Sequence, residues 1–470
     1  MEHFGTDRDW AFEQFAAAEF GDRRRRSRAV LIAQRAVANP AGRLTAVFKD
    51  CAELQGAYDF VQGPVSVAAM MDAIASATCT QIGRETRVYG VVDGSSLSLT
   101  DRTGKKGFGA VGMRKLPTRG LKVISMLAVS EAGVSVGLLD QHWWVRGNKS
   151  RGSRYVRRKK GLTETHHWVE CIATGTDRLA TNAPGCSPCL VIDREGDNAE
   201  ILLAVRAQPH SRSIIRAAQN RPVRLGNGRR GKLRSQLGKQ PVLGTRVVNV
   251  PAGPGRSART AVLDLRAMQV VLDLPDRANS KRRALETNVV WAVERRPPHG
   301  EKRLDWMLLT TEPIDTSDAV SHVIDGYCLR WRIEDFHRTW KSGTCNVEDT
   351  QLRKSEHVQR WATILAAVAT RVEQLKHLAR TTPDEPASVA LSSVEIQALL
   401  AAKRHFSGHR EQIPDGVPTI AQAVRWIADL GGYTGKSSGG LPGSITITRG
   451  LEYLRPWTAG FQAGMRARRK

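Results

Sequence analysis

The sequence predicts a mixed α/β protein in which a central sheet is flanked by helices, with all-helical domains at both ends of the chain. Three observations predict this arrangement. Apolar residues recur at helical spacing up to about residue 75, short strand-like apolar runs begin at about residue 85, and helical spacing returns toward the end of the chain. A chain of 470 residues is long enough for two or three domains.

Residues 1–75 are predicted to form a helical N-terminal domain. An apolar pattern runs from Trp10 to Phe20, the cluster Arg23–Arg26 opens a second helix, and Ser66 is a candidate N-cap for a later one. An arginine cluster on a small helical domain is suited to binding a DNA end. A solvent-exposed helix start would produce the same cluster, and both interpretations stay open.

A sheet with interleaved helices is predicted for the next segment. The elements expected, in order, are strands at Val88–Val92, Leu121–Val129 and Val134–Leu139, a helix at Thr163–Leu179, a strand at Leu190–Ile192 and a helix from about Asn198. This order of three strands, a helix, a strand and a helix is the opening of an RNase H-like core. We expect this core, a mixed sheet flanked by helices, to occupy residues 76–378.

A basic, β-rich insertion is predicted within the core at about residues 212–310. The stretch from Ile201 to Leu263 contains 13 Arg or Lys residues and no Asp or Glu. Strand-like runs follow at Ala261–Leu274, Asn288–Val293 and Trp306–Leu309. A second acid-free run, from Arg146 to Lys160, has eight basic residues in fifteen. A single charge run is usually a solvated face, but two such runs favour a surface that follows nucleic-acid phosphates.

The overall charge also indicates a polyanionic partner. Lys and Arg number 71 against 46 Asp and Glu, which gives a net charge of +25. Nucleic acid is the commonest partner of such a chain, although an anionic lipid surface or a merely basic protein would fit the same number. The longest apolar stretch, Trp361–Thr370, is far short of the roughly 20 residues of a membrane span.

The expected location is the cytoplasm, in association with the nucleoid. The N-terminus has no signal-peptide pattern, and seven scattered cysteines favour a reducing compartment. Cys186 and Cys189 form a lone C-x-x-C that is better explained as two ordinary thiols than as a zinc site.

Residues 379–470 are predicted to form a helical C-terminal domain that pairs two protomers. Pro383 and Pro386 mark a linker at its start. Helices are expected at Ser393–Phe406, Thr419–Leu430 and Ile447–Phe461.

One segment, Ile324–Lys341, has the pattern of an amphipathic helix. At about 100° per residue, one face carries Tyr327, Arg330, Glu334 and Lys341, while Leu329, Ile333, Phe336 and Trp340 lie on the opposite face and would dock on the sheet. Taken alone, the segment is better explained as a surface helix whose Arg330–Glu334 and Glu334–Arg338 pairs add a little stability.

Two aspartates change that balance. Asp93 and Asp193 each end or interrupt an apolar strand, where an ionised side chain is costly unless it is hydrogen-bonded or binds a metal. Asp93 could instead be a turn residue before Gly94, and Asp193 could be a helix N-cap. Together with Glu334, the two aspartates could hold two Mg²⁺ ions about 4 Å apart, one to activate a water or a DNA 3′-hydroxyl and one to stabilise the leaving oxygen.

The chain resembles the insertion-sequence-four family of DDE transposases. The family signature Y-x-x-R-x-x-x-E-x-x-x-x-x-x-K is matched with every spacing intact at Tyr327, Arg330, Glu334 and Lys341. The D-R-E-A-D block appears as Asp193–Asp197 and departs only at Gly196, and the first-aspartate block has Gly94 where Thr is expected. The resemblance extends from about Trp10 to Phe461 and is strong only around these three blocks.

The resemblance implies particular roles. Asp93, Asp193 and Glu334 would be the catalytic ligands of two Mg²⁺ ions, with Mn²⁺ as a substitute. Tyr327, Arg330 and Lys341 would contact phosphates of double-stranded DNA near the cleaved end, and Arg216 resembles a further phosphate contact. Trp306 occupies a base-stacking position of the family, although a core aromatic on a strand would explain it equally well.

The resemblance implies a cut-and-paste transposase that works as a homodimer. It would bind inverted-repeat ends, nick each end, close and reopen a hairpin, and join the 3′-hydroxyls to target DNA. Two other functions are compatible with parts of the same sequence pattern. One is an RNase H-like nuclease without strand transfer, and the other is a DNA-binding protein derived from a transposase that no longer cuts.

Overall fold

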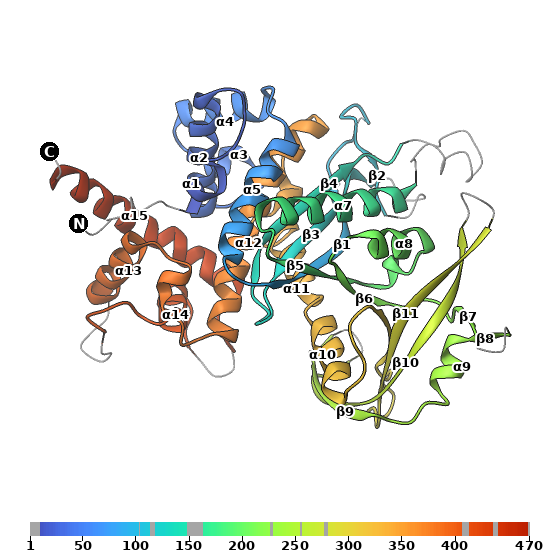
Figure 1. The fold of residues 1–470 in the computed structure, drawn as a ribbon. Helices are drawn as coiled ribbons and strands as arrows, with labels where there is room; N and C mark the ends of the chain where they lie inside the picture. The colour runs from blue at the N-terminus through green and yellow to red at the C-terminus, as the bar shows by residue number, and fades with distance from the viewer. Residues whose placement is uncertain are drawn as a thin grey trace.

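The computed structural model describes residues 10–102, 104–112, 118–147, 163–225, 229–253, 256–276, 281–406, 413–435 and 440–468. Figure 1 shows helices from the two ends of the chain on one side of a long, twisted sheet. Among the described residues no single helix is long and apolar enough to cross a membrane, although the pair Cys51–Gln62 and Val67–Ile82, bent by 106°, passes that test together.

Five helices precede the sheet. They are α1 (Trp10–Phe15), α2 (Arg23–Ala38), α3 (Leu44–Val47), α4 (Cys51–Gln62) and α5 (Val67–Ile82). The helix predicted to open at Arg23 is confirmed, with Asp22 as its N-cap. The predicted cap of α5 is also confirmed, because the Ser66 hydroxyl accepts the backbone N–H of Ala69 at 3.4 Å.

The predicted order of the central elements is confirmed. They are β1 (Arg87–Leu99), β2 (Gly109–Ala110), β3 (Arg119–Val129), β4 (Ser135–Trp144), α7 (Glu164–Asn182), β5 (Ser187–Ile192), η1 (Arg194–Gly196), α8 (Ala199–Ala207) and β6 (Arg212–Arg216). β3 pairs antiparallel with both β4 and β1, whereas β1, β5 and β6 pair in parallel. A mixed sheet flanked by helices is consistent with the expected RNase H-like core.

The basic segment continues the same sheet. Its elements are β7 (Pro222–Arg224), β8 (Arg230–Lys232), α9 (Leu233–Leu237), β9 (Gly244–Val250), β10 (Arg259–Asp276), β11 (Lys281–Glu294) and β12 (Asp305–Thr310). β12 pairs antiparallel with β6, and the sheet then runs on through β11 and β10 (Figure 1). The three strand runs expected here lie in β10, β11 and β12. Of the second basic run, residues 148–160 lie outside the described residues.

The single helix predicted for Ile324–Lys341 is wrong. The segment forms α10 (Ser317–Cys328) and α11 (Trp331–Lys341), with a break at Leu329 and Arg330. At the break the N–H of Arg330 bonds to the carbonyl of Tyr327 at 3.1 Å, three residues back instead of four. The two halves have different neighbours besides β1. Gly326 of α10 lies against Tyr89 of β1 and Ile214 of β6, whereas α11 contacts β1 and a long helix, α12 (Ser355–Thr381).

The two faces of the sheet carry different helices. On β1, Tyr89 and Val91 join the core formed with α11 and α12, whereas Val88 and Val92 join the core formed with α7. Alternate residues of a strand point to opposite faces, so odd-numbered residues at this point of β1 face α11 and α12. This alternation decides which helix each side chain meets.

The chain ends in helices, as expected. After η2 (Val347–Asp349), α12 and η3 (Ala387–Val389) come α13 (Ser393–Phe406), α14 (Ile420–Leu430) and α15 (Ser444–Arg468). Thr419 and Gln422 form a capping box at the start of α14. α15 is longer than expected and contacts α2, and Val372 and Leu375 of α12 belong to the core of these last helices.

Candidate active site

The sheet places Asp93 and Asp193 side by side. Val92 and Ile192 are the last paired residues of the parallel strands β1 and β5, so the aspartates that follow them lie side by side at the end of β5, from where β1 continues to Leu99. Continued alternation directs both toward the face covered by α11. Burial, together with the negative charge of Asp193, raises the pKa of Asp93 to about 7, although Arg330 and the N–H of Gly94 act to lower it.

Glu334 reaches the same edge through Arg330. The Arg330 Nη2 donates to Glu334 Oε1 at 2.5 Å, and its Nη1 lies 4.0 Å from Asp93 Oδ2. Below them, the buried His337 of α11 lies 3.4 Å from the hydroxyl of Ser125, the residue paired with Asp93 across β1 and β3. At the start of α11, Glu334 therefore shares a guanidinium with Asp93 of β1.

One of the two alternatives for Asp193, the N-cap, is seen in the structure. Its Oδ1 accepts the N–H of Glu195 at 2.7 Å and caps η1. Such a cap orders the carboxylate without neutralising its charge, so the same side chain can also serve as a metal ligand.

Glu195 is an acidic neighbour that the sequence did not single out. A Cβ placed on Gly94 would lie 3.8 Å from Glu195 Oε2, which puts this carboxylate beside β1 on the α7 side of the sheet. Burial and the charge of Asp193 raise the pKa of Glu195, and Lys122 opposes them. Its position two residues after Asp193, in the turn that Asp193 caps, was the available signal.

The last acid of this block, Asp197, has a different setting. It accepts the N–H groups of Ala218 and Gln219 at 2.7 and 2.9 Å and pairs with Arg221 at 2.5 Å. This buried network fixes the loop after β6. It is therefore a structural group.

The two departures from the family blocks have steric causes. A Cβ on Gly196 would lie 2.5 Å from the side chain of Ile192, so alanine does not fit there without movement. A Cβ on Gly94 would lie 3.2 Å from Ile124 and 3.3 Å from Trp168, which is already tight for one methyl group.

Three of the predicted DNA-contacting residues meet in one cluster. The rings of Trp306 on β12 and Tyr327 on α10 are edge to face with centroids 5.3 Å apart. The guanidinium of Arg216 on β6 lies 6.0 Å from the Tyr327 ring centroid and 3.5 Å from its hydroxyl. The structure thus brings together residues that are far apart in the sequence.

This cluster lines a groove of about 1060 Å³ whose lining also includes Arg194, the residue after Asp193, and Arg330. Seven of its twenty lining residues are Arg or Lys, namely Arg194, Arg216, Arg234, Arg256, Lys302, Arg303 and Arg330. Arg330 belongs to both the groove and the acidic site. A basic groove that shares Arg330 with neighbouring acids is suited to a phosphodiester backbone.

Lys341 lies apart from that cluster. Its ammonium is 3.9 Å from Glu348 Oε1, and the same oxygen accepts the N–H of Ser98 at 2.7 Å. Ser98 is five residues beyond Asp93 on β1, about 17 Å along an extended strand. Lys341 is therefore near the far end of β1.

The donor set at the sheet edge fits a divalent metal. Asp93, Asp193 and Glu334 offer only carboxylate oxygens, the ligands that Mg²⁺ prefers. Arg330 is the one cation paired with this trio among the ion pairs of the described residues, so negative charge is in excess. The raised pKa of Asp93 is the consequence of that excess and of burial.

Two protein-family models match the chain. Residues 7–64 match the model described as transposase DNA-binding, and residues 177–371 match the transposase DDE domain. Both matches support a DDE transposase. The DDE match contains Asp193 and Glu334 and begins after Asp93, so the place of Asp93 in the transposase rests on strand register and its contact with Arg330. A DDE domain implies an enzyme that cuts DNA with divalent metal, and the N-terminal match supports DNA as the transposase's partner.

Proposed function

We propose that this transposase is a cut-and-paste enzyme of the insertion-sequence-four type, in which Asp93, Asp193 and Glu334 hold two Mg²⁺ ions, with Mn²⁺ as a substitute. The observation that carries the proposal is that Asp93 on β1 lies beside Asp193 at the end of β5, while one guanidinium links Asp93 to the glutamate of the Tyr327–Lys341 signature. When bound, such ions activate the attacking oxygen and stabilise the leaving oxygen of a phosphodiester.

Arg330 contacts two of the proposed metal ligands. Its guanidinium donates to Glu334 and lies near Asp93. A cation held by Glu334 would compete with Arg330 for that carboxylate, and Arg330 would then donate to a phosphate oxygen of the DNA end. In this role Arg330 would orient the substrate.

The groove supplies the path for the DNA end. Arg216 and Tyr327 contact phosphate there, and the face of Trp306 stacks on a base that leaves the helix when the hairpin forms. Lys341, at the far end of β1, contacts a phosphate farther along the same DNA.

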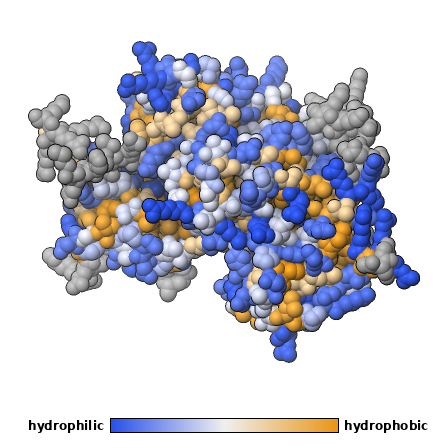
Figure 2. All heavy atoms as spheres, in the orientation of Figure 1, coloured by the Kyte–Doolittle hydropathy of each residue, from blue (hydrophilic) through white to orange (hydrophobic). Residues whose placement is uncertain are grey.

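The chain divides into three working parts under this proposal. Residues 1–75 bind the element end, residues 76–378 form an RNase H-like catalytic domain with the β-rich insertion at about 212–310, and residues 379–470 pair two protomers. Figure 2 shows apolar side chains gathered over the C-terminal helices. Exposed apolar residues of this region include Phe406, Leu441, Ile445 and Tyr453. The enzyme would act in the cytoplasm on nucleoid DNA.

The test uses purified protein, Mg²⁺ and a labelled duplex that carries the element end, analysed on a denaturing gel. Wild type should cut at the element boundary and give hairpin and joined products, and Glu334→Ala should give none of them. Glu356→Ala is the matched control, because Glu356 is an exposed glutamate at the start of α12. Cutting without joining would favour a nuclease, and binding without cutting by wild type would overturn the proposal.

A further inference from the structure

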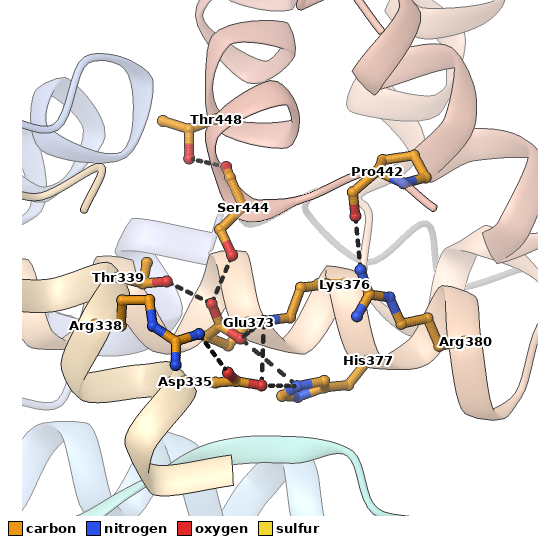
Figure 3. Close-up of polar contacts among 10 residues, drawn as sticks. All are labelled: Asp335, Arg338, Thr339, Glu373, Lys376, His377, Arg380, Pro442, Ser444 and Thr448. Atoms are coloured by element: carbon orange, nitrogen blue, oxygen red, sulfur yellow. Dashed lines mark hydrogen bonds and ion pairs between the residues drawn. The ribbon is translucent and has the colours of Figure 1, made fainter. Parts of the chain in front are cut away.

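A second group of charged residues lies between α11 and α12, and its first member is Asp335, the residue after Glu334. Glu373 of α12 is fully buried, yet one of its oxygens joins three helices. Glu373 Oε1 accepts from the hydroxyl of Thr339 on α11 at 2.5 Å and from the hydroxyl of Ser444, the first residue of α15, at 2.7 Å (Figure 3). The helix that carries Glu334 and the last helix of the chain therefore share one acceptor.

The other Glu373 oxygen belongs to a charge network. Oε2 pairs with Lys376, whose ammonium is also 3.5 Å from Asp335 Oδ2. Arg338 donates to Asp335 at 3.1 Å, and the buried His377 lies 3.7 Å from Asp335 and 3.5 Å from Glu373. Asp335, Glu373 and His377 are close enough to suggest a metal site, but Lys376 already provides the cation between the two acids.

A buried carboxylate is a costly way to join helices. Apolar residues of similar size pack at least as well, and a buried ion network is kept where a specific arrangement has to be selected. Here the arrangement fixes α11 at Asp335 and Thr339, both within five residues of Glu334. What the network selects is the placement of α11.

We propose that Glu373 is a positioning residue that couples the start of α15 to Glu334, so that docking of the C-terminal helices sets how well the three carboxylates bind metal. The proposal rests on the proposed metal-binding role of Asp93, Asp193 and Glu334. Its consequence is that the C-terminal helices influence metal affinity although they lie outside the acidic site.

The test compares two substitutions at the start of α15. Ser444→Ala removes the hydroxyl that reaches Glu373, whereas Thr446→Ala removes a hydroxyl that bonds only to Gly443 of its own turn. Mn²⁺ binding to the full-length protein without DNA is followed by electron paramagnetic resonance. Ser444→Ala should raise the half-saturating Mn²⁺ concentration at least about threefold, because a hydrogen bond to a buried charge is lost, and Thr446→Ala should leave it unchanged.

A pair of substitutions at Glu373 separates positioning from general packing. Glu373→Gln keeps an acceptor for Thr339 and Ser444, so it should bind Mn²⁺ more like wild type than Glu373→Ala does. Equal Mn²⁺ affinities for Ser444→Ala and Thr446→Ala would overturn the coupling. If wild type binds Mn²⁺ and responds to Ser444→Ala but cuts no DNA, the coupling stands and the transposase proposal fails.

Discussion

Glu334 and Asp335 are neighbours on α11 with opposite electrostatic settings. Glu334 shares the Arg330 guanidinium with Asp93, and the pKa of Asp93 is raised to about 7 by burial and by Asp193. Burial also acts to raise the pKa of Asp335, but its contact with His377 and the charges of Lys376, His377 and Arg338 outweigh this and hold the pKa at about 2. The Glu334 side of α11 has more acidic than basic groups, whereas on the Asp335 side the acids are paired with cations.

The difference shows that closeness of acids does not identify a metal site by itself. Asp335, Glu373 and His377 lie within 4.8 Å of one another, but their charge is met by protein cations. The sheet-edge acids lack that compensation, which is what a divalent ion supplies. Uncompensated charge is therefore the better signal.

A substitution in the charge-paired network around Asp335 should have the largest effect on stability. Glu373→Ala leaves the buried Lys376 with only Asp335 as an acidic partner and removes both hydroxyl contacts, which should lower the free energy of unfolding by about 3 kcal/mol. Urea denaturation followed by circular dichroism measures the loss. A loss below about 1 kcal/mol would show that the network contributes little.

Removal of a negative charge near Glu334 should have the opposite effect and raise the free energy of unfolding. The folded-state pKa of Asp93, about 7, lies above its ordinary value of 3.8, so the folded protein binds a proton more tightly between these two values. Stability then falls as pH rises from about 4 to about 7, and the cost is complete above 7. Asp93→Asn without metal should raise the free energy of unfolding by about 2 kcal/mol at pH 8 and by nearly nothing at pH 4. If Asp93→Asn were less stable than wild type at pH 8, the excess of negative charge around Asp93 would be contradicted.

The same proton should compete with metal. Below about pH 7, Mn²⁺ affinity should rise about tenfold per pH unit, because Asp93 must lose its proton to bind, and it should level off above that pH. Mn²⁺ titrations by electron paramagnetic resonance between pH 5.5 and 8 measure the slope. A flat profile for wild type would remove Asp93 from the metal site.

A substitution of Trp306 in the groove should have the smallest effect of those considered. Trp306→Ala should slow hairpin formation about tenfold through the loss of one stacked base, while the first nick stays near the wild-type rate. Trp306→Phe keeps an aromatic face and should recover most of the loss. Equal slowing of both steps on a denaturing gel would assign Trp306 to the core that it forms with Tyr327.

The sequence was informative where short-range patterns carry the information. Asp93 and Asp193 follow apolar runs, and the runs proved to be paired parallel strands, so the position of both aspartates at one edge followed from strand order. The break at Leu329 and Arg330 was missed because helical periodicity does not record which surface each half packs against. The same error placed Lys341 on one continuous face with Tyr327.

Polar contacts between residues far apart in the chain could not be predicted from sequence patterns. Glu373 and Lys376 belong to one long helix, but Glu373's partners Thr339 and Ser444 are 34 and 71 residues away in the sequence. Spacing within one element cannot reveal such contacts. Glu195 was within reach, since it follows Asp193 by two residues, but its side chain is aimed by the turn that Asp193 caps.

The most direct test of the central claim is a metal-switch experiment at Asp193. Asp193→Cys replaces a hard oxygen ligand with a softer sulfur, which suits Mn²⁺ better than Mg²⁺. Cleavage of the labelled element end should be lost in Mg²⁺ and partly restored in Mn²⁺, while Glu356→Cys should cut in both. Cleavage by Asp193→Cys at the wild-type rate in Mg²⁺, or no recovery in Mn²⁺, would contradict metal binding by the three carboxylates.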